Sequence, residues 1–316
     1  MKRSARRRLV VPAYAKINLG LEVLGLREDG YHELRTLFQA VDLHDDVIVE
    51  LCASGVTVDC SHPEVPCDAR NLAARAAQAL LRYSGLRRGV ALTLVKRIPV
   101  AGGLGGGSSD AAAVLMALDA LFELKLGTTG LYPIARRLGA DVPFFLFGGT
   151  ALGLGRGDEI YPLRHQIESQ VVIVEPGRPV ATPAVFRRID AGLTPRENSS
   201  TIYRFVSSDL DGSAAFQILT NELEEAALEE APELASVVRR SRTLMRRSGA
   251  LFASLSGSGS SFFGLFDQAN SAQRAVERLR GAGMTAYRCR TVSIDRYRKT
   301  WERALRLAGA RPAWSQ

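Results

Sequence analysis

KRIPVAGGLGGGSSDAAA, residues 96–113, is a glycine-dense turn that runs directly into an alanine-rich segment. Five of the nine positions from Gly102 to Asp110 are glycine. Glycine tolerates positive φ and lets backbone N–H groups approach an anion, and a helix start adds free N–H donors and the positive end of the helix dipole. We expect a helix over 109–124, capped by Ser108 and Ser109, with a hydroxyl in reach of a metal or a phosphate oxygen. The order of strand, glycine run, serine pair and helix favours phosphate binding over a flexible surface turn.

The usual signatures of other phosphate-binding and hydrolytic enzymes are missing from the sequence. It contains no GxxxxGK[ST] P-loop and no GxGxxG window. The HRD and DFG motifs of protein kinases, the GxSxG turn of hydrolases and the HExxH helix of zinc proteases are also absent. We therefore expect the glycine backbone and the helix dipole, rather than a loop lysine, to hold the phosphates.

The hydrophobic pattern of the first half predicts strands mixed with helices. Alternating apolar positions indicate strands, and helical spacing behind a capping residue indicates helices. The predicted elements are strands over 9–26, 46–58 and 90–98, a helix over 71–84 between the cap Asn71 and Gly85, a short helix over 131–138, and a buried strand pair over 144–154.

The second half has a different order of elements. The pattern predicts a buried strand over 171–177, a loop over 190–200, helices over 214–230 and 233–248, strands over 250–256 and 262–266, a helix over 271–282 and a strand over 285–294. The last part of this series is typical of a split βαβ or ferredoxin-like fold. Because the pattern changes between residues 155 and 170, we predict an α+β protein of two domains, 1–160 and 161–316.

Composition indicates a folded cytoplasmic enzyme. The 316 residues are 46% hydrophobic and 23% charged, which is normal for a globular chain. The four cysteines form no CxxC pair and have no histidine at zinc spacing, so we expect free thiols. No run of about 18 apolar residues is present, and Lys16 and Asn18 interrupt the segment where a signal peptide would need its apolar core. We expect no membrane partner.

The positive charge lies at the two ends of the chain. The formal net charge is +8, the first eight residues carry five basic side chains and no acid, and residues 274–316 carry eleven basic and three acidic side chains. A nucleic-acid-binding protein usually has its basic face on the fold itself, interleaved with aromatic residues. The intervening part is net negative, so we expect no nucleic-acid partner and keep that function as the weakest alternative.

Five separate segments resemble the GHMP kinases, the family of galactokinase, homoserine, mevalonate and phosphomevalonate kinases. PVAGGLGGGSSDAA (99–112) resembles the central motif, AYAKINLGLEV (13–23) the first and SLSGSGSSFFGLF (254–266) the third. GYHELRTLFQAVDLHD (30–45) and LGADVPFFLFGG (138–149) resemble the branch that phosphorylates a cytidine-diphosphate-bearing sugar alcohol in isoprenoid precursor biosynthesis. The resemblance implies an N-terminal αβ nucleotide-binding domain and a C-terminal ferredoxin-like domain.

The resemblance also implies ATP and Mg²⁺ as cofactors, with the ATP phosphates held by the central motif. The residues expected to bind ATP are Pro99, Val100, Ala101, Gly102, Gly103, Leu104, Gly105, Gly106, Gly107, Ser108 and Ser109. The third motif is expected to close near the phosphates, although it also reads as an ordinary hairpin turn. No residue is assigned to magnesium. Asp110 would repel a phosphate at this helix start, so we expect it either to point to solvent or to meet the metal.

Lys16 and Asp141 are the catalytic residues that the resemblance implies. Asp141 would accept the proton of the attacking hydroxyl, and Lys16 would neighbour it and offset charge on the transferred phosphoryl group. From the residues alone, Asp141 reads equally well as a helix N-cap ahead of Pro143, and Lys16 as part of an exposed strand face. Asn18 shares the strand face of Lys16 by the two-residue period and is expected to bind substrate.

A cytosine site is implied by the GYH segment. Tyr31 would stack on the base and His32 would hydrogen-bond its edge, while Phe186 supplies the opposite stacking face and Thr182 a polar contact. Tyr31 also reads as a packing residue and His32 as scaffold. The alternative is a GHMP kinase of the homoserine or mevalonate type, whose substrate has no base to stack. Tyr14 stands where proline is more usual, and the sequence indicates no oligomeric state.

Overall fold

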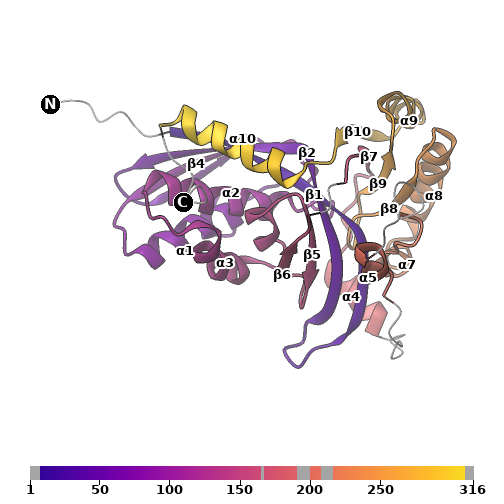
Figure 1. The fold of residues 1–316 in the computed structure, drawn as a ribbon, viewed down its shortest axis with the longest axis horizontal. Coiled ribbons are helices and arrows are strands. Elements are labelled where there is room, and N and C mark those ends of the chain that lie inside the picture. The colour runs from indigo at the N-terminus through magenta and orange to yellow at the C-terminus, as the bar shows by residue number, and fades with distance from the viewer. Residues whose placement is uncertain (1–7, 165–166, 191–199, 208–215, 310–316) are drawn as a thin grey trace.

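The structure is a computed structural model that describes residues 8–164, 167–190, 200–207 and 216–309. It contains two β-sheets, each packed against its own helices (Figure 1). The first sheet has six strands in the order β3-β4-β2-β5-β6, with β1 paired to β2. Its strands are β1 (Arg8–Leu26), β2 (His32–Cys52), β3 (Val56–Cys60), β4 (Gly89–Val95), β5 (Thr150–Leu154) and β6 (Glu159–Pro162). Its helices are α1 (Leu72–Ser84), α2 (Gly106–Leu121), α3 (Gly127–Leu138) and the 3₁₀ turn η1 (Pro143–Leu146).

The second sheet is antiparallel and has the order β10-β7-β9-β8. Its strands are β7 (Gln170–Glu175), β8 (Phe252–Leu255), β9 (Phe262–Phe266) and β10 (Thr285–Arg290). Its helices are α4 (Thr182–Asp190), α5 (Thr201–Ser207), α7 (Leu223–Glu230), α8 (Pro232–Arg247) and α9 (Ala269–Gly281). In chain order this is strand, helices, two strands, helix, strand, which confirms the predicted ferredoxin-like arrangement.

The last helix, α10 (Ile294–Leu307), returns to the first sheet. It lies along β1 at the end of the molecule that holds α1–α3 (Figure 1). Its Tyr297 and Trp301 are buried in one cluster with Val11 and Tyr14 of β1. A division of the chain at residue 160 stays a prediction, and α10, which it assigns to the second domain, packs on the first.

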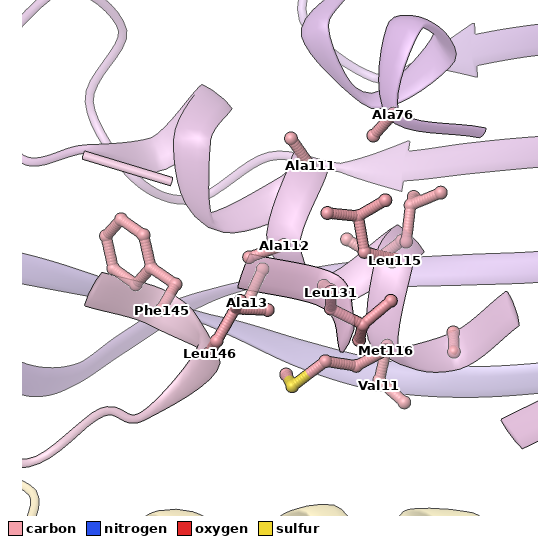
Figure 2. Close-up of a cluster of buried hydrophobic side chains, with 14 of the residues drawn as sticks. Val11, Ala13, Ala76, Ala111, Ala112, Leu115, Met116, Leu131, Phe145 and Leu146 are labelled. Carbon is pink, nitrogen blue, oxygen red and sulfur yellow. The ribbon is translucent and has the colours of Figure 1, made fainter. Parts of the chain in front are cut away.

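Helix α2 is the central element of the first core. All of its residues from Ser109 to Leu121 are buried, as expected for a helix that is apolar on every side. Ala111, Ala112 and Leu115 belong to the same cluster as Val11 and Ala13 of β1 (Figure 2). Alanine side chains let the helix approach the sheet closely, and this close packing fixes the position of the helix start.

A register shift in β1 directs its polar residues. The pairing with β2 shifts between Tyr14 and Ala15, a β-bulge that redirects the side chains beyond it. Before the shift Val11 and Ala13 pack with the helices, whereas beyond it Ala15 and Ile17 pack with the second sheet. The even-numbered residues after the bulge therefore face the start of α2.

Several predicted boundaries differ from the structure. The helix over 71–84 is confirmed with its Asn71 cap and a left-handed Gly85. The strand pair over 144–154 is wrong in its first half, because Pro143 begins a 3₁₀ turn and only Thr150–Leu154 is a strand. The single strand over 46–58 is two strands, β2 and β3. The predicted loop over 190–200, apart from its two end residues, lies outside the described residues, as do residues 214 and 215 of the predicted helix over 214–230.

The Glu22 carboxylate links β1 to α5 through hydrogen bonds. Its carboxylate accepts hydrogen bonds from the Ile202 N–H at 3.1 Å, the hydroxyls of Ser200 and Thr201 at 2.8 Å, and Arg35 at 2.9 Å. Burial would raise the pKa of Glu22, but these hydrogen bonds together lower it. The charged form therefore stabilises the fold.

Replacement of Glu22 by glutamine is expected to lower the melting temperature at neutral pH. A lowered folded-state pKa stabilises the fold above the unfolded value, about 4.3, and this contribution is lost as the pH falls below it. Glutamine does not titrate, so the difference from the unaltered chain should stay constant from pH 7 to about pH 5 and shrink between about pH 5 and pH 3. Calorimetry across this range is the measurement, and a difference that stays constant over the whole range would contradict the charge-based account.

Candidate active site

The glycine loop ends at the start of α2, which lies three residues before the predicted one. Gly105 is the N-cap with φ 72°, and no side chain caps the helix. The prediction that Ser108 and Ser109 cap it is wrong, because both lie in the first turn. The N–H groups of Gly106, Gly107 and Ser108 have no preceding helical turn to bond to, which leaves them available to an anion.

The glycines of the loop have different structural reasons. A Cβ at Gly103, where φ is 76°, would lie 2.3 Å from the Ser256 carbonyl oxygen. At Gly105, where φ is 72°, it would lie 2.8 Å from the Phe145 ring. These two glycines are required by close packing whether or not a phosphate binds. Gly107 differs, because a Cβ there meets nothing within 4 Å and would stand in open space at the helix start.

The third motif lies against this loop. Ser261 donates its N–H to the Gly102 carbonyl at 3.0 Å, and the Ser256 hydroxyl donates to the Gly103 carbonyl at 2.9 Å. Asn221 in turn donates to the carbonyls of Leu255 and Gly257. The segment is therefore more than a hairpin turn, since it holds the central motif in place.

Lys16 and Asp141 come together at the same place. Lys16 is 4% exposed, its Nζ lies 3.5 Å from Asp141 Oδ2, and its N–H donates to the Leu104 carbonyl at 2.9 Å. The exposed-strand interpretation of Lys16 is therefore wrong. Asp141 is not the N-cap of η1 either, because Val142 holds that position. The carboxylate stays 36% exposed and accessible.

Asn18 lies on the same strand face and orients Lys16. Its Oδ1 accepts from Lys16 Nζ at 2.6 Å, and its Nδ2 donates to Thr36 Oγ1 at 2.8 Å. The Ser256 hydroxyl is 3.4 Å from the same Oδ1. Asn18 is 2% exposed, so in this structure its amide is occupied by the protein, and contact with substrate stays a prediction.

Asp110 does not point to solvent. It is 2% exposed and accepts from Lys96 Nζ at 2.6 Å, and the same ammonium pairs with the fully buried Asp45. Burial raises the pKa of Asp110 to about 7, with Lys96 opposing the rise and Asp45 adding to it. Asp45 also accepts from the backbone N–H groups of Arg97 and Ile98 at 2.5 and 2.8 Å. The sequence interpretation assigned no role to Lys96 or Asp45, and it expected no lysine at this loop.

The residues predicted for the cytosine site are gathered at the tip of the β1–β2 hairpin and on α4. His32 stacks on Phe186, with ring centroids 4.5 Å apart at 21°, and its Nε2 lies 2.6 Å from Asp190 Oδ1. Tyr31 is 56% exposed. The His32 ring covers one face of Phe186, so a base that stacks on Phe186 must use the other face or displace the imidazole. The hydroxyl of Thr182 is 2.7 Å from that of Ser258 and links α4 to the third motif.

Tyr14, the departure from the usual first motif, contacts α10 rather than the site. Its ring lies 5.4 Å from that of Tyr297 and 5.5 Å from His44, and its hydroxyl bonds with Thr300. Burial raises its pKa. The tyrosine therefore anchors the C-terminal helix.

Two absences apply to the described residues. None of their helices has both the length and the apolar character that a membrane span needs. In the same part of the chain no three His, Cys, Asp or Glu side chains are grouped as a metal site.

Comparison with known families defines the class. The model described as GHMP kinases N terminal domain matches residues 71–149, and the one described as GHMP kinases C terminal matches residues 211–284. A crystal structure of homoserine kinase from Cytophaga hutchinsonii shares the fold with a TM-score of 0.69 over 93% of this chain and 97% of that one, at 20% identity. The class is that of the GHMP kinases, which are ATP-dependent small-molecule kinases.

Closer relatives narrow this class. The 4-diphosphocytidyl-2-C-methyl-D-erythritol kinase of Solibacter usitatus (strain Ellin6076) is 41% identical over 307 residues, 96% of this chain and 94% of that protein. A crystal structure of 4-(cytidine 5'-diphospho)-2C-methyl-D-erythritol kinase is 40% identical, with a TM-score of 0.71 over 90% of this chain and 99% of that one. The chain belongs to the 4-diphosphocytidyl-2-C-methyl-D-erythritol kinase family.

Proposed function

We propose that this chain transfers the γ-phosphoryl group of ATP to the 2-hydroxyl of 4-diphosphocytidyl-2-C-methyl-D-erythritol, a step of non-mevalonate isoprenoid precursor synthesis. The observation that carries the proposal is the buried Lys16 ammonium 3.5 Å from Asp141, beside the open start of α2. The substrate is inferred from the family to which the chain belongs. Relatives of the homoserine kinase type support the shared fold alone.

The chemistry follows from this arrangement. The substrate hydroxyl oxygen forms a bond to the γ-phosphorus, the bond from that phosphorus to the β,γ-bridging oxygen breaks, and ADP leaves. The hydroxyl proton goes to the Asp141 carboxylate, which is exposed enough to meet it. Lys16, held by Asn18, offsets the negative charge on the transferred group. The free N–H groups at Gly106–Ser108 bind the phosphates that do not react.

Residues of this chain fit a magnesium ion bound with ATP. Mg²⁺ usually takes one or two protein oxygens and completes its ligands with phosphates and water. The Ser109 hydroxyl, in the first turn of α2, is buried and has no hydrogen-bond partner among the described residues. We propose that this oxygen holds the ion, which would neutralise phosphate charge when bound.

The nucleobase site is proposed at Tyr31, His32, Thr182 and Phe186. Tyr31 presents an exposed side chain for stacking. His32 follows it in the sequence, and the His32 ring stacks on Phe186 of α4. The hydrogen bond between His32 Nε2 and Asp190 Oδ1, at 2.6 Å, holds the imidazole against Phe186. Affinity for substrate should then be largely affinity for its cytidine diphosphate half.

Truncation of Tyr31 to alanine should raise the KM for the cytidine substrate and leave the KM for ATP nearly unchanged. Base–aromatic stacking is worth about 1–3 kcal/mol, so the KM should rise roughly 5- to 150-fold at 1.4 kcal/mol per decade. Steady-state kinetics measure both constants. Tyr83→Ala is the matched control, because Tyr83 is 61% exposed and lies on α1. A silent Tyr31→Ala variant would refute the stacking role.

CDP alone should inhibit competitively against the cytidine substrate and not against ATP. UDP should inhibit more weakly, because His32 is expected to read the edge of the base rather than its face. Inhibition patterns with both nucleotides test this. If CDP competes only with ATP, the proposed base site is wrong, and a substrate of the homoserine or mevalonate type becomes the better assignment.

A further inference from the structure

Arg156 lies over the ring that is proposed to stack on the base. Its guanidinium carbon is 4.8 Å from the centroid of the Tyr31 ring. Arginine over a tyrosine face is attracted by the ring quadrupole, by about 0.5–1 kcal/mol at an exposed site. Neither the sequence interpretation nor the resemblance assigned a role to Arg156.

The arginine comes from a turn that is fixed to the hairpin carrying Tyr31. The turn between β5 and β6 has Gly155 and Gly157 at φ 66° and 83°. The Gly155 carbonyl accepts the N–H of Leu34, two residues into β2, at 2.6 Å. Arg156 therefore starts from a backbone position that is tied to the tip of the hairpin.

The other end of the arginine is held by a buried carboxylate. Arg156 donates to Asp158 Oδ2 at 2.8 Å, and Asp158 is 1% exposed. The same oxygen accepts from Arg136 at 2.9 Å, and the hydroxyl of Tyr132 donates to the Asp158 carbonyl. The guanidinium is therefore held on one side by the buried Asp158 carboxylate while it lies over the tyrosine ring.

The Asp29 carboxylate holds the backbone of Tyr31 at the tip of the hairpin. Asp29 Oδ1 accepts the backbone N–H of Tyr31 at 3.1 Å. This hydrogen bond lowers the pKa of Asp29, and the charges of Arg27 and Arg156 lower it further. The backbone of Tyr31 is thus held by Asp29 and its ring by Arg156, although the residue is 56% exposed.

We propose that Arg156 is a positioning residue for the nucleobase. Its guanidinium stacks on one face of the Tyr31 ring and holds the ring so that the opposite face receives the cytosine. The inference rests on the proposed function. The contact with Arg156 lowers the cost of binding, because a ring that is already held loses less conformational freedom when the base binds. Arg156 contacts Tyr31 and Asp158, and among the described interactions it meets neither Lys16, Asp141 nor the glycine loop, so its effect should fall on binding of the cytidine half.

The test is a double-mutant cycle read by calorimetry with CDP as the probe. Arg156→Met should weaken CDP binding about 2- to 5-fold, and Arg156→Lys should retain most of the affinity. In the Tyr31→Ala background, Arg156→Met should have no further effect. The kcat with saturating substrate should be unchanged in Arg156→Met, while the KM rises.

Arg136→Met is the matched control. Arg136 also donates to Asp158 and is 38% exposed, but it makes no contact with Tyr31 among the described interactions. It should leave CDP binding unchanged. If Arg136→Met weakens CDP as much as Arg156→Met does, the effect belongs to Asp158 and the proposal is overturned.

Two further results would overturn the proposal. Tighter CDP binding by Arg156→Met would show that the arginine covers the face that the base needs. An equal loss in the Tyr31→Ala background would show a direct contact of Arg156 with the ligand. Arg156→Gln, which can still donate to Asp158, gives the same readout if the methionine variant does not fold. Failure of the unaltered chain to bind CDP would instead refute the proposed function.

Discussion

Asp141→Asn is expected to abolish most turnover while ATP still binds. Asparagine keeps the size of the side chain beside Lys16 but cannot take the hydroxyl proton. General-base catalysis contributes about 10²- to 10⁴-fold, so kcat should fall by that factor. The Kd for ATP, measured by calorimetry, should stay close to that of the unaltered chain, because the phosphates are proposed to bind at the start of α2.

The control for this variant is Asp59→Asn, which removes an exposed carboxylate from β3. It should leave kcat unchanged. Asp141→Ala is a second variant that also removes the hydrogen-bonding group. Near-normal kcat in folded Asp141→Asn would remove Asp141 from the mechanism.

Gly107→Val is expected to lower ATP affinity by about tenfold or more without unfolding the chain, since helical side chains lean toward the N-terminus and would cover the free N–H groups. A Cβ at this position meets nothing within 4 Å, so the protein itself accommodates it. Valine at Gly105 is a poorer test because it would meet the Phe145 ring, and at Gly106 it would crowd Ile98.

Gly281→Val is the matched control for the added side chain. Gly281 lies in α9, and a Cβ there also meets nothing within 4 Å. This variant should bind ATP like the unaltered chain, with calorimetry and melting temperature measured for both. Unchanged ATP affinity in Gly107→Val would indicate that the loop is a surface turn that does not bind the phosphates.

The features that could be predicted from the sequence are those set by local patterns. The alternation of β1 placed Lys16 and Asn18 on one face, and the 2.6 Å hydrogen bond between them confirms it. Asn71 and Gly85 bound α1 as their types predict. Asp141 had no local signal that distinguished a base from a cap, so its place beside Lys16 depended on the resemblance.

The features that could not be predicted depend on contacts between distant segments. Lys96 pairs with Asp45, 51 residues away, and with Asp110, and no local pattern marks such a buried group. The early start of α2 was missed because Gly106 and Gly107 are poor helix formers, whereas packing decides the boundary. The stacking of His32 on Phe186 joins the β1–β2 hairpin to α4, which the separate motifs did not show.

The most direct test of the proposed function is ADP release by the purified chain with ATP and Mg²⁺ against three acceptors. The acceptors are 4-diphosphocytidyl-2-C-methyl-D-erythritol, homoserine and mevalonate, with the phosphorylated position assigned by NMR. We predict ADP release with the first acceptor alone and a product phosphorylated at its 2-hydroxyl. ADP release with homoserine or mevalonate, and none with the cytidine compound, would contradict the account.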